Sequence, residues 1–80
     1  MPAYTALITT PFRQGSLAYE FDNLTAELEH LGLTDAEMGS IGYVFEFFTP
    51  LDKRQLDREI REIVNYYGLV LGSLEENEYW

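Results

Sequence analysis

The ten-residue segment from Ser40 to Thr49, SIGYVFEFFT, constrains the fold of this chain more than any other feature. Its β-branched and aromatic residues are typical of a strand, and Pro50 follows directly. Because side chains on a strand alternate between two faces, the segment divides into two sets. One face carries Ile41, Tyr43, Phe45 and Phe47, and the other carries Gly42, Val44, Glu46 and Phe48. With Glu46 as the only charge, the pattern predicts a central strand of a sheet.

Two further segments predict strands near the ends of the chain. Residues Tyr4 to Thr10, YTALITT, are rich in β-branched and apolar types and stop at Pro11. Residues Leu69 to Leu74, LVLGSL, form the second. From about residue 75 an acidic stretch begins, which we expect to be a short tail, while Leu33 to Met38 (LTDAEM) predicts a loop or a single helical turn.

A helical stripe precedes the central segment. Apolar residues recur at steps of four and three at Leu17, Phe21, Leu24, Leu28 and Leu31. This spacing predicts an amphipathic helix from Ser16 to Leu31 that Gly32 ends. The beginning of the helix stays open, since Leu17, Tyr19 and Phe21 also alternate as a strand would. In that alternative Arg13 to Ser16 form a hairpin turn, and Asp22 or Asn23 caps a shorter helix.

A second helix is predicted from Leu51 or Asp52 to Tyr67, with Gly68 closing it. The 80 residues therefore predict one α+β domain, a small two-layer sandwich of the order β-α-β-α-β. If the early hairpin forms, the order becomes β-β-α-β-α-β. Two amphipathic helices would pack on a sheet of three or four strands.

The sheet has a face that the helices need not cover. If both helices lie on the same side, the opposite face exposes Val44 and Phe48, with Tyr4 or Leu7 alongside. An exposed apolar face of this kind marks an interface. Val44 and Phe48 are therefore candidate residues of a homodimer contact or of a docking face for another protein.

Composition limits the compartment and the class of protein. The chain is 46% hydrophobic and 15% aromatic, which is typical of a folded domain rather than an acidic disordered tail. It has no cysteine, so disulfides and thiolate metal sites are excluded. No basic and apolar leader precedes the first strand, and no apolar run approaches the roughly 20 residues that span a bilayer. We expect a cytoplasmic protein, in the host cytoplasm if it is phage-encoded, with no membrane partner.

The formal net charge is −9, from 14 acidic and five basic residues. Phosphate backbones and anionic lipids attract clusters of Lys and Arg, so direct binding to nucleic acid is not expected. Four of the five bases, Lys53, Arg54, Arg58 and Arg61, fall in the second predicted helix. Three pairs there have i,i+4 spacing and could form ion pairs along the helix surface: Lys53–Asp57, Asp57–Arg61 and Arg58–Glu62.

The remaining acids concentrate in the first part of the chain, where Arg13 is the only base in the first fifty residues. We predict that they form a one-sided partner-binding patch consisting of Glu20, Asp22, Glu27, Glu29, Asp35, Glu37 and Glu46. Such a surface attracts a basic protein and raises the association rate. The simpler interpretation, acids that only keep a helix face solvated, is not excluded by the sequence.

Catalytic constellations are missing from the sequence. His30 is the only histidine, and its place near a predicted helix end is typical of a solvated residue. There is no glycine-rich phosphate loop, HExxH or GxSxG motif, and no calcium-binding loop. The sequence predicts a protein that is not an enzyme and that needs no cofactor or metal.

The small, acidic, cysteine-free and aromatic-rich profile is similar to that of phage-encoded inhibitors of host nucleic-acid machinery, including anti-CRISPR and other DNA-mimic proteins. The resemblance is one of composition, and no motif carries it. It implies an inhibitor or adaptor that blocks the basic groove of a partner, such as a nucleic-acid-binding complex. The alternative is a small homodimeric regulatory or ligand-sensing domain that associates through its sheet.

Overall fold

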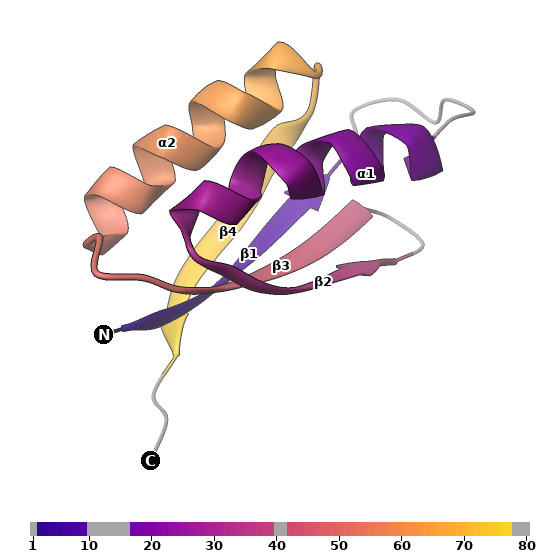
Figure 1. Ribbon diagram of the computed structural model, residues 1–80. Coiled ribbons are helices and arrows are strands. Elements are labelled where there is room, and N and C mark those ends of the chain that lie inside the picture. The colour runs from indigo at the N-terminus through magenta and orange to yellow at the C-terminus, as the bar shows by residue number, and fades with distance from the viewer. Residues whose placement is uncertain (1, 10–16, 40–41, 78–80) are drawn as a thin grey trace.

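The computed structural model describes residues 2–9, 17–39 and 42–77, and for residues 17–20 the backbone alone (Figure 1). Along the chain the elements are β1 (Ala3–Thr9), α1 (Leu17–Leu28), the 3-10 turn η1 (Glu29–Leu31), β2 (Leu33–Met38), β3 (Gly42–Phe48), α2 (Lys53–Tyr66) and β4 (Val70–Asn77). The described part of the chain therefore follows the order β-α-β-β-α-β.

The four strands form one sheet in the order β2-β3-β1-β4, and all three neighbouring pairs are antiparallel. This is the split β-α-β arrangement, also called the ferredoxin-like topology. The predicted α+β class, with two helices on a four-stranded sheet, is confirmed. The central position expected for the segment around Phe45 is confirmed as well, because β3 lies between β2 and β1.

Both helices pack on the same face of the sheet (Figure 1). The core between the layers consists of Tyr4, Ala6, Ile8, Leu24, Leu28, Leu31, Tyr43, Phe45, Phe47, Leu56, Ile60, Val64, Leu69, Leu71 and Leu74. The half-buried ring of Phe21 on α1 packs against Tyr43 and Phe45, with ring centroids 5.4 and 5.9 Å away. These contacts join the first helix to the centre of the sheet.

The early hairpin considered for the first helix is wrong, because Leu17 to Leu28 form the helix α1. Its turn, Arg13 to Ser16, lies outside the described residues. The predicted end is confirmed: Gly32 follows η1 with a φ of 96°. An added Cβ there would lie 2.5 Å from the carbonyl oxygen of Phe48. A side chain at this position would therefore be strained both by this contact and by the positive φ.

The structure corrects the expectation of a loop or helical turn at Leu33 to Met38, which forms the edge strand β2. It pairs with β3 from Leu33 opposite Phe47 to Met38 opposite Tyr43. The register shifts between Leu33 and Asp35, so Thr34 is an extra residue, and its Oγ1 donates to the carbonyl of Glu46 at 3.1 Å. Pairing with a well-buried neighbour overrides the weak strand propensity of this segment.

One further boundary, the end of β4, differs from the prediction, and the start of the second helix agrees with it. The strand β4 continues to Asn77, so an acidic tail from about residue 75 is wrong for Glu75 and Glu76. These residues pair with Thr5 and Tyr4 of β1. The second helix begins as expected, because Asp52 accepts a hydrogen bond from the Gln55 backbone at 2.8 Å and caps α2.

Candidate protein-binding surface

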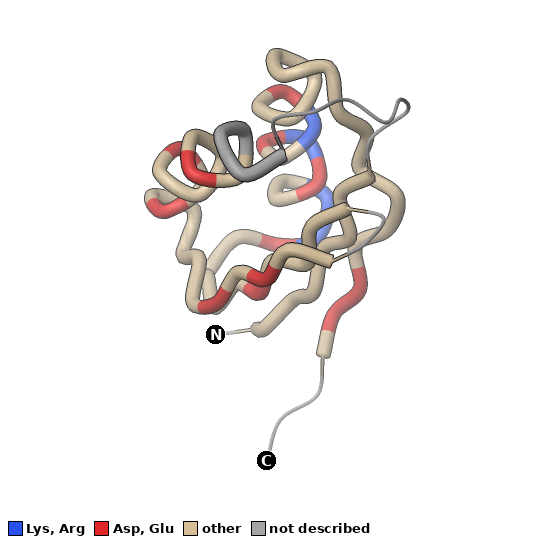
Figure 2. Tube along the Cα trace, turned by 90° about the vertical axis from the view of Figure 1, so that its right-hand side faces the viewer, with Lys and Arg blue, Asp and Glu red and all other residues tan. Residues whose placement is uncertain are grey.

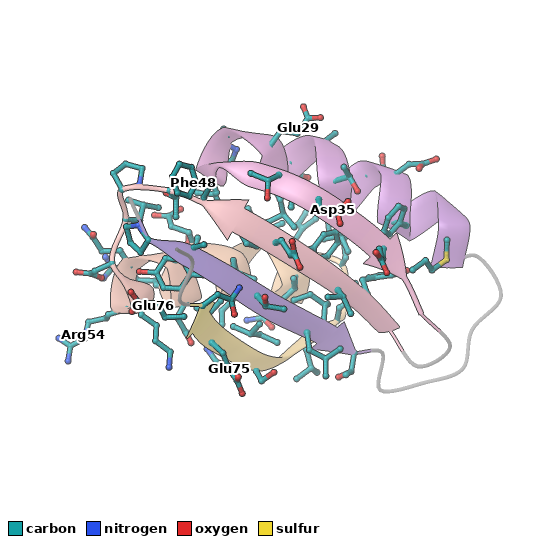
Figure 3. All side chains as sticks on the ribbon, turned by 90° about the horizontal axis from the view of Figure 1, so that it is seen from below. Glu29, Asp35, Phe48, Arg54, Glu75 and Glu76 are labelled. Atoms are coloured by element: carbon teal, nitrogen blue, oxygen red, sulfur yellow. The ribbon has the colours of Figure 1, made fainter. Side chains whose placement is uncertain are left out.

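The face of the sheet turned away from the helices, here called the open face, carries a small apolar centre (Figure 3). Val44 on β3 and Leu7 on β1 are directly opposite each other and half-buried. Phe48 and Val70 lie further out on the same face, with 49% and 46% of their surface exposed. The prediction that the uncovered face presents Val44, Phe48 and Leu7 is confirmed. The alternative to Leu7, Tyr4, does not lie on this face.

Tyr4 points to the helices instead. It lies opposite Phe47, is 2% exposed, and its hydroxyl donates to the carbonyl oxygen of Leu51 at 3.1 Å. Burial raises the pKa of the Tyr4 phenol above its usual value, and the negative charges of Glu76 and Asp52 raise it further. Tyr4 is thus a core residue that ties β1 to the start of α2.

Carboxylates surround the apolar centre of the open face. Directly opposed residues share a face, so the register places Asp35, Glu46, Thr5 and Glu75 in one row that crosses all four strands. The next row contains Glu37, Val44, Leu7 and Ser73. In the first row Asp35 stands directly opposite Glu46, and like charges in this position destabilise a sheet. The arrangement is costly for the isolated protein.

No Lys or Arg of the described residues lies on the open face. The four described bases all belong to α2, on the other side of the sheet (Figure 2). There Lys53, Arg54 and Asp57 line an open hollow of about 400 Å³. The side chain of Arg54 points away from the sheet (Figure 3).

The ion pairs predicted along α2 are only partly present. Arg61 pairs with Asp57 at 2.6 Å, as expected. The expected pairs Lys53–Asp57 and Arg58–Glu62 are wrong, since neither reaches ion-pair distance in the described part of the chain. The four bases of α2 are nevertheless offset by three acids of the same helix, Asp57, Glu59 and Glu62, so the helix is close to neutral.

The structure divides the predicted acidic patch between two surfaces. Asp35, Glu37 and Glu46 lie together on the open face. Asp22, Glu27 and Glu29 are exposed on the helical layer, while the side chain of Glu20 lies outside the described residues. Glu27 also has a structural contact, because it accepts a hydrogen bond from the Tyr67 hydroxyl at 2.5 Å.

One acid of the open face was missed by sequence reasoning. Glu75 stands opposite Thr5 on β4, in the same row as Asp35 and Glu46. Glu75 was missed because the residues from about 75 were predicted to form a tail rather than a strand. The available signal was strand alternation, because Leu71 and Leu74 are buried while Ser73 and Glu75 are exposed. A bulge beside Gly72 interrupts this alternation.

Other chemistry is limited in residues 2–9, 17–39 and 42–77. His30 is exposed, as expected for a solvated residue near a helix end. Within these ranges no three His, Asp or Glu side chains are grouped as metal ligands would be. Neither α1 nor α2 has the length and apolarity that crossing a membrane requires.

Comparison with known proteins gives no relative: no family model, curated protein or solved structure matches the chain.

Proposed function

We propose that this protein is a non-enzymatic inhibitor or adaptor that binds a basic protein through its open face. The observation that carries the proposal is the row of Asp35, Glu46 and Glu75 beside the apolar pair Val44 and Leu7, with no described base among them. The partner is a protein whose own function is to bind nucleic acid. Its basic groove would accept these carboxylates in place of phosphates, as expected for a DNA-mimic or anti-CRISPR inhibitor.

The mixed character of the open face supports a protein partner. Protein interfaces combine a desolvated apolar centre with a polar, solvent-accessible rim. Here Val44, Leu7 and Phe48 supply apolar contact area, and the surrounding acids supply attraction over a longer range. A partner that carried bases at matching positions would also relieve the repulsion between Asp35 and Glu46.

The same charges argue against two other ligands. Four-stranded sheets that bind RNA stack bases on aromatic side chains, and phosphate binding requires nearby bases. The exposed ring of Phe48 lies on the same strand as Glu46, with no described Lys or Arg on this face. Face-to-face pairing of two copies would bring both sets of carboxylates into one interface, which opposes a symmetric homodimer.

The test compares two variants with the same change in net charge. The first replaces three acids of the open face, Asp35→Lys, Glu46→Lys and Glu75→Lys. The second replaces three exposed acids of the helices, Asp22→Lys, Glu29→Lys and Glu62→Lys. Each protein is used for affinity capture from lysate at low and high salt, and the captured proteins are quantified by mass spectrometry. A candidate partner is then purified, and its nucleic-acid binding is measured with each variant.

We expect a basic protein that the wild type and the helix variant capture at low salt and the open-face variant does not. The wild type should also displace nucleic acid from that protein. Equal capture by both variants, with circular dichroism unchanged, would contradict the proposal. So would a partner whose nucleic-acid binding is unaffected.

The homodimeric regulatory domain stays a prediction with its own measurement. If the open face mediates self-association, wild-type protein should sediment as a dimer at micromolar concentration, and Val44→Asp or Phe48→Asp should sediment as a monomer. A wild-type protein that is monomeric under these conditions would remove this alternative.

A further inference from the structure

We infer that the edge strand β2 accepts a strand of the partner in which basic and apolar residues alternate, so that the sheet is extended by one strand. The inference rests on the proposed function, because it names how a basic partner would engage the acids Asp35 and Glu37. Strand addition of this kind takes its affinity from main-chain hydrogen bonds and its specificity from alternate side chains.

The backbone of β2 offers the required groups. The Gly39 amide donates to the carbonyl of Gly42 at 2.7 Å, which fixes the phase of the ladder between β2 and β3. Because hydrogen-bonded positions in an antiparallel pair recur every second residue, Asp35 and Glu37 direct their backbone groups to β3. Ala36 and Met38 then direct theirs outward, where no described strand pairs with them.

The side chains of β2 define the sequence of the added strand. Asp35 and Glu37 point to the open face, so partner residues beside them should be Lys or Arg. Ala36 and Met38 point to the helical side, opposite the buried residues Phe45 and Tyr43. Met38 is 46% exposed there, and its flexible side chain suits an apolar contact. Basic and apolar residues should therefore alternate.

A second copy of this chain does not fit the same edge. In an antiparallel pairing of two β2 strands, residues that stand opposite each other lie on the same face of the continuous sheet. Asp35 and Glu37 would therefore oppose Asp35 or Glu37 of the other copy in each register that overlaps them. Carboxylate opposite carboxylate disfavours self-pairing, which is a common role of charges on edge strands.

The other edge of the sheet is less suitable. In β4 the register with β1 shifts between Leu7 and Ile8, beside Gly72 and near the middle of the strand. Such a bulge twists an edge away from regular pairing. In β2 the shift lies near the start, at Thr34, and Asp35 to Met38 stay in regular register with β3.

The test uses an alternating lysine–valine heptapeptide with blocked ends. The control peptide has the same composition with its lysines in one block, so it cannot place bases on one side of a strand only. Binding is measured by fluorescence anisotropy with wild type, Met38→Pro and Met38→Ala. Proline removes the outward amide without removing a bond to β3, and both substitutions preserve the net charge.

We expect Met38→Ala to bind the alternating peptide more weakly than wild type, because the side-chain contact is lost, and Met38→Pro to bind about tenfold more weakly than Met38→Ala, as for one lost hydrogen bond. Hydrogen exchange at the amides of Ala36 and Met38 should slow in the wild-type complex, a readout that does not depend on the folding of the proline variant. Equal binding of both peptides, or unchanged exchange at these amides, would overturn the inference.

The failure of the strand addition is separable from the failure of the proposed function. Asp35→Lys combined with Glu37→Lys should abolish peptide binding. If binding is lost in this variant but Met38→Pro binds like Met38→Ala, the acidic face is needed and the edge pairing is wrong. If charge reversal leaves peptide binding unchanged, the attraction of basic partners, and with it the proposed function, is contradicted.

Discussion

The two faces of the central strand β3 differ in burial and in charge. Tyr43, Phe45 and Phe47 on the helical face have at most 1% of their surface exposed, and they belong to the core that also includes buried residues of both helices. Val44, Glu46 and Phe48 on the open face alternate with them along the same backbone and leave a charged residue between two apolar ones. One face is built for stability, while the other carries uncompensated charge.

The contrast indicates that the open face was not shaped by folding alone. The helical face already supplies a core, so folding does not require a particular residue type at the exposed positions of the other face. Placing Asp35 opposite Glu46 weakens the sheet at a position that a neutral or basic residue could occupy. Features that cost stability are expected where a protein performs its function.

The largest expected effect is the loss of stability when a side chain on the helical face of β3 is truncated, compared with a truncation on its open face. Phe45→Ala should lower the free energy of unfolding by about 3–5 kcal/mol, because it removes a ring packed between Phe21 and Tyr43. Val44→Ala, its neighbour on the open face, should cost less than about 1.5 kcal/mol because that side chain is only half-buried. Urea unfolding of the two variants checks this, and equal losses would contradict the division of the strand.

A smaller effect on the free energy of unfolding is expected at high pH, and it comes from the buried phenol of Tyr4. Its pKa is raised in the folded protein, so the unfolded chain releases this proton first as pH rises. The contribution of the protonated Tyr4 phenol to the stability of the folded protein is therefore complete below the pKa of the unfolded chain, about 10. It decreases as pH rises through the folded pKa. Tyr4→Phe should lose about 1 kcal/mol at neutral pH with the hydrogen bond to Leu51.

The measurement is the urea midpoint of wild type and Tyr4→Phe between neutral and alkaline pH. The other tyrosines titrate in both proteins, so the difference between the two curves isolates Tyr4. Because phenylalanine cannot ionise, the stability gap should narrow or reverse above pH about 10. A constant gap would show that the ionisation of Tyr4 is not linked to unfolding.

The smallest expected effect is a gain in stability, in contrast to the losses above. Glu46→Lys replaces a repulsive pair with an attractive one opposite Asp35, and it should stabilise the protein by about 0.2–1 kcal/mol. The gain should diminish at high salt if it is electrostatic. Asp22→Lys is the control, since it changes the net charge equally on the exposed side of α1. An equal gain in both variants would mean that total charge, rather than the local pair, is responsible.

Much of the fold could be predicted because most elements carry a periodic apolar signal. The apolar stripe through Leu24 and Leu28 predicts α1, and the alternation of side chains around Phe45 predicts β3. The edge strand β2 has no such signal, since Leu33 and Ala36 are only half-buried and the other four residues are exposed. It is a strand because β3 offers it a ladder of hydrogen bonds, which is long-range information.

The candidate surface was only partly predictable for the same reason. Composition indicated the acids, and alternation placed Val44 and Glu46 on one face of their strand. Joining Asp35, Glu46 and Glu75 in one row requires the strand order, which connects residues forty positions apart. The sequence therefore predicts a single patch, whereas half of its acids with described side chains belong to the open face and the other half to the helical layer.

The central place of β1 has a consequence for how the chain becomes folded. Its partners β3 and β4 come from the second half of the sequence, and Thr5 accepts a hydrogen bond from Asn77 at 2.6 Å. During synthesis the first strand must wait for nearly the whole domain before its second edge is paired. Pairings this distant make folding slow relative to a helical bundle of similar size. Until then β1 exposes an unpaired edge, and the strong negative charge of the chain provides repulsion against aggregation.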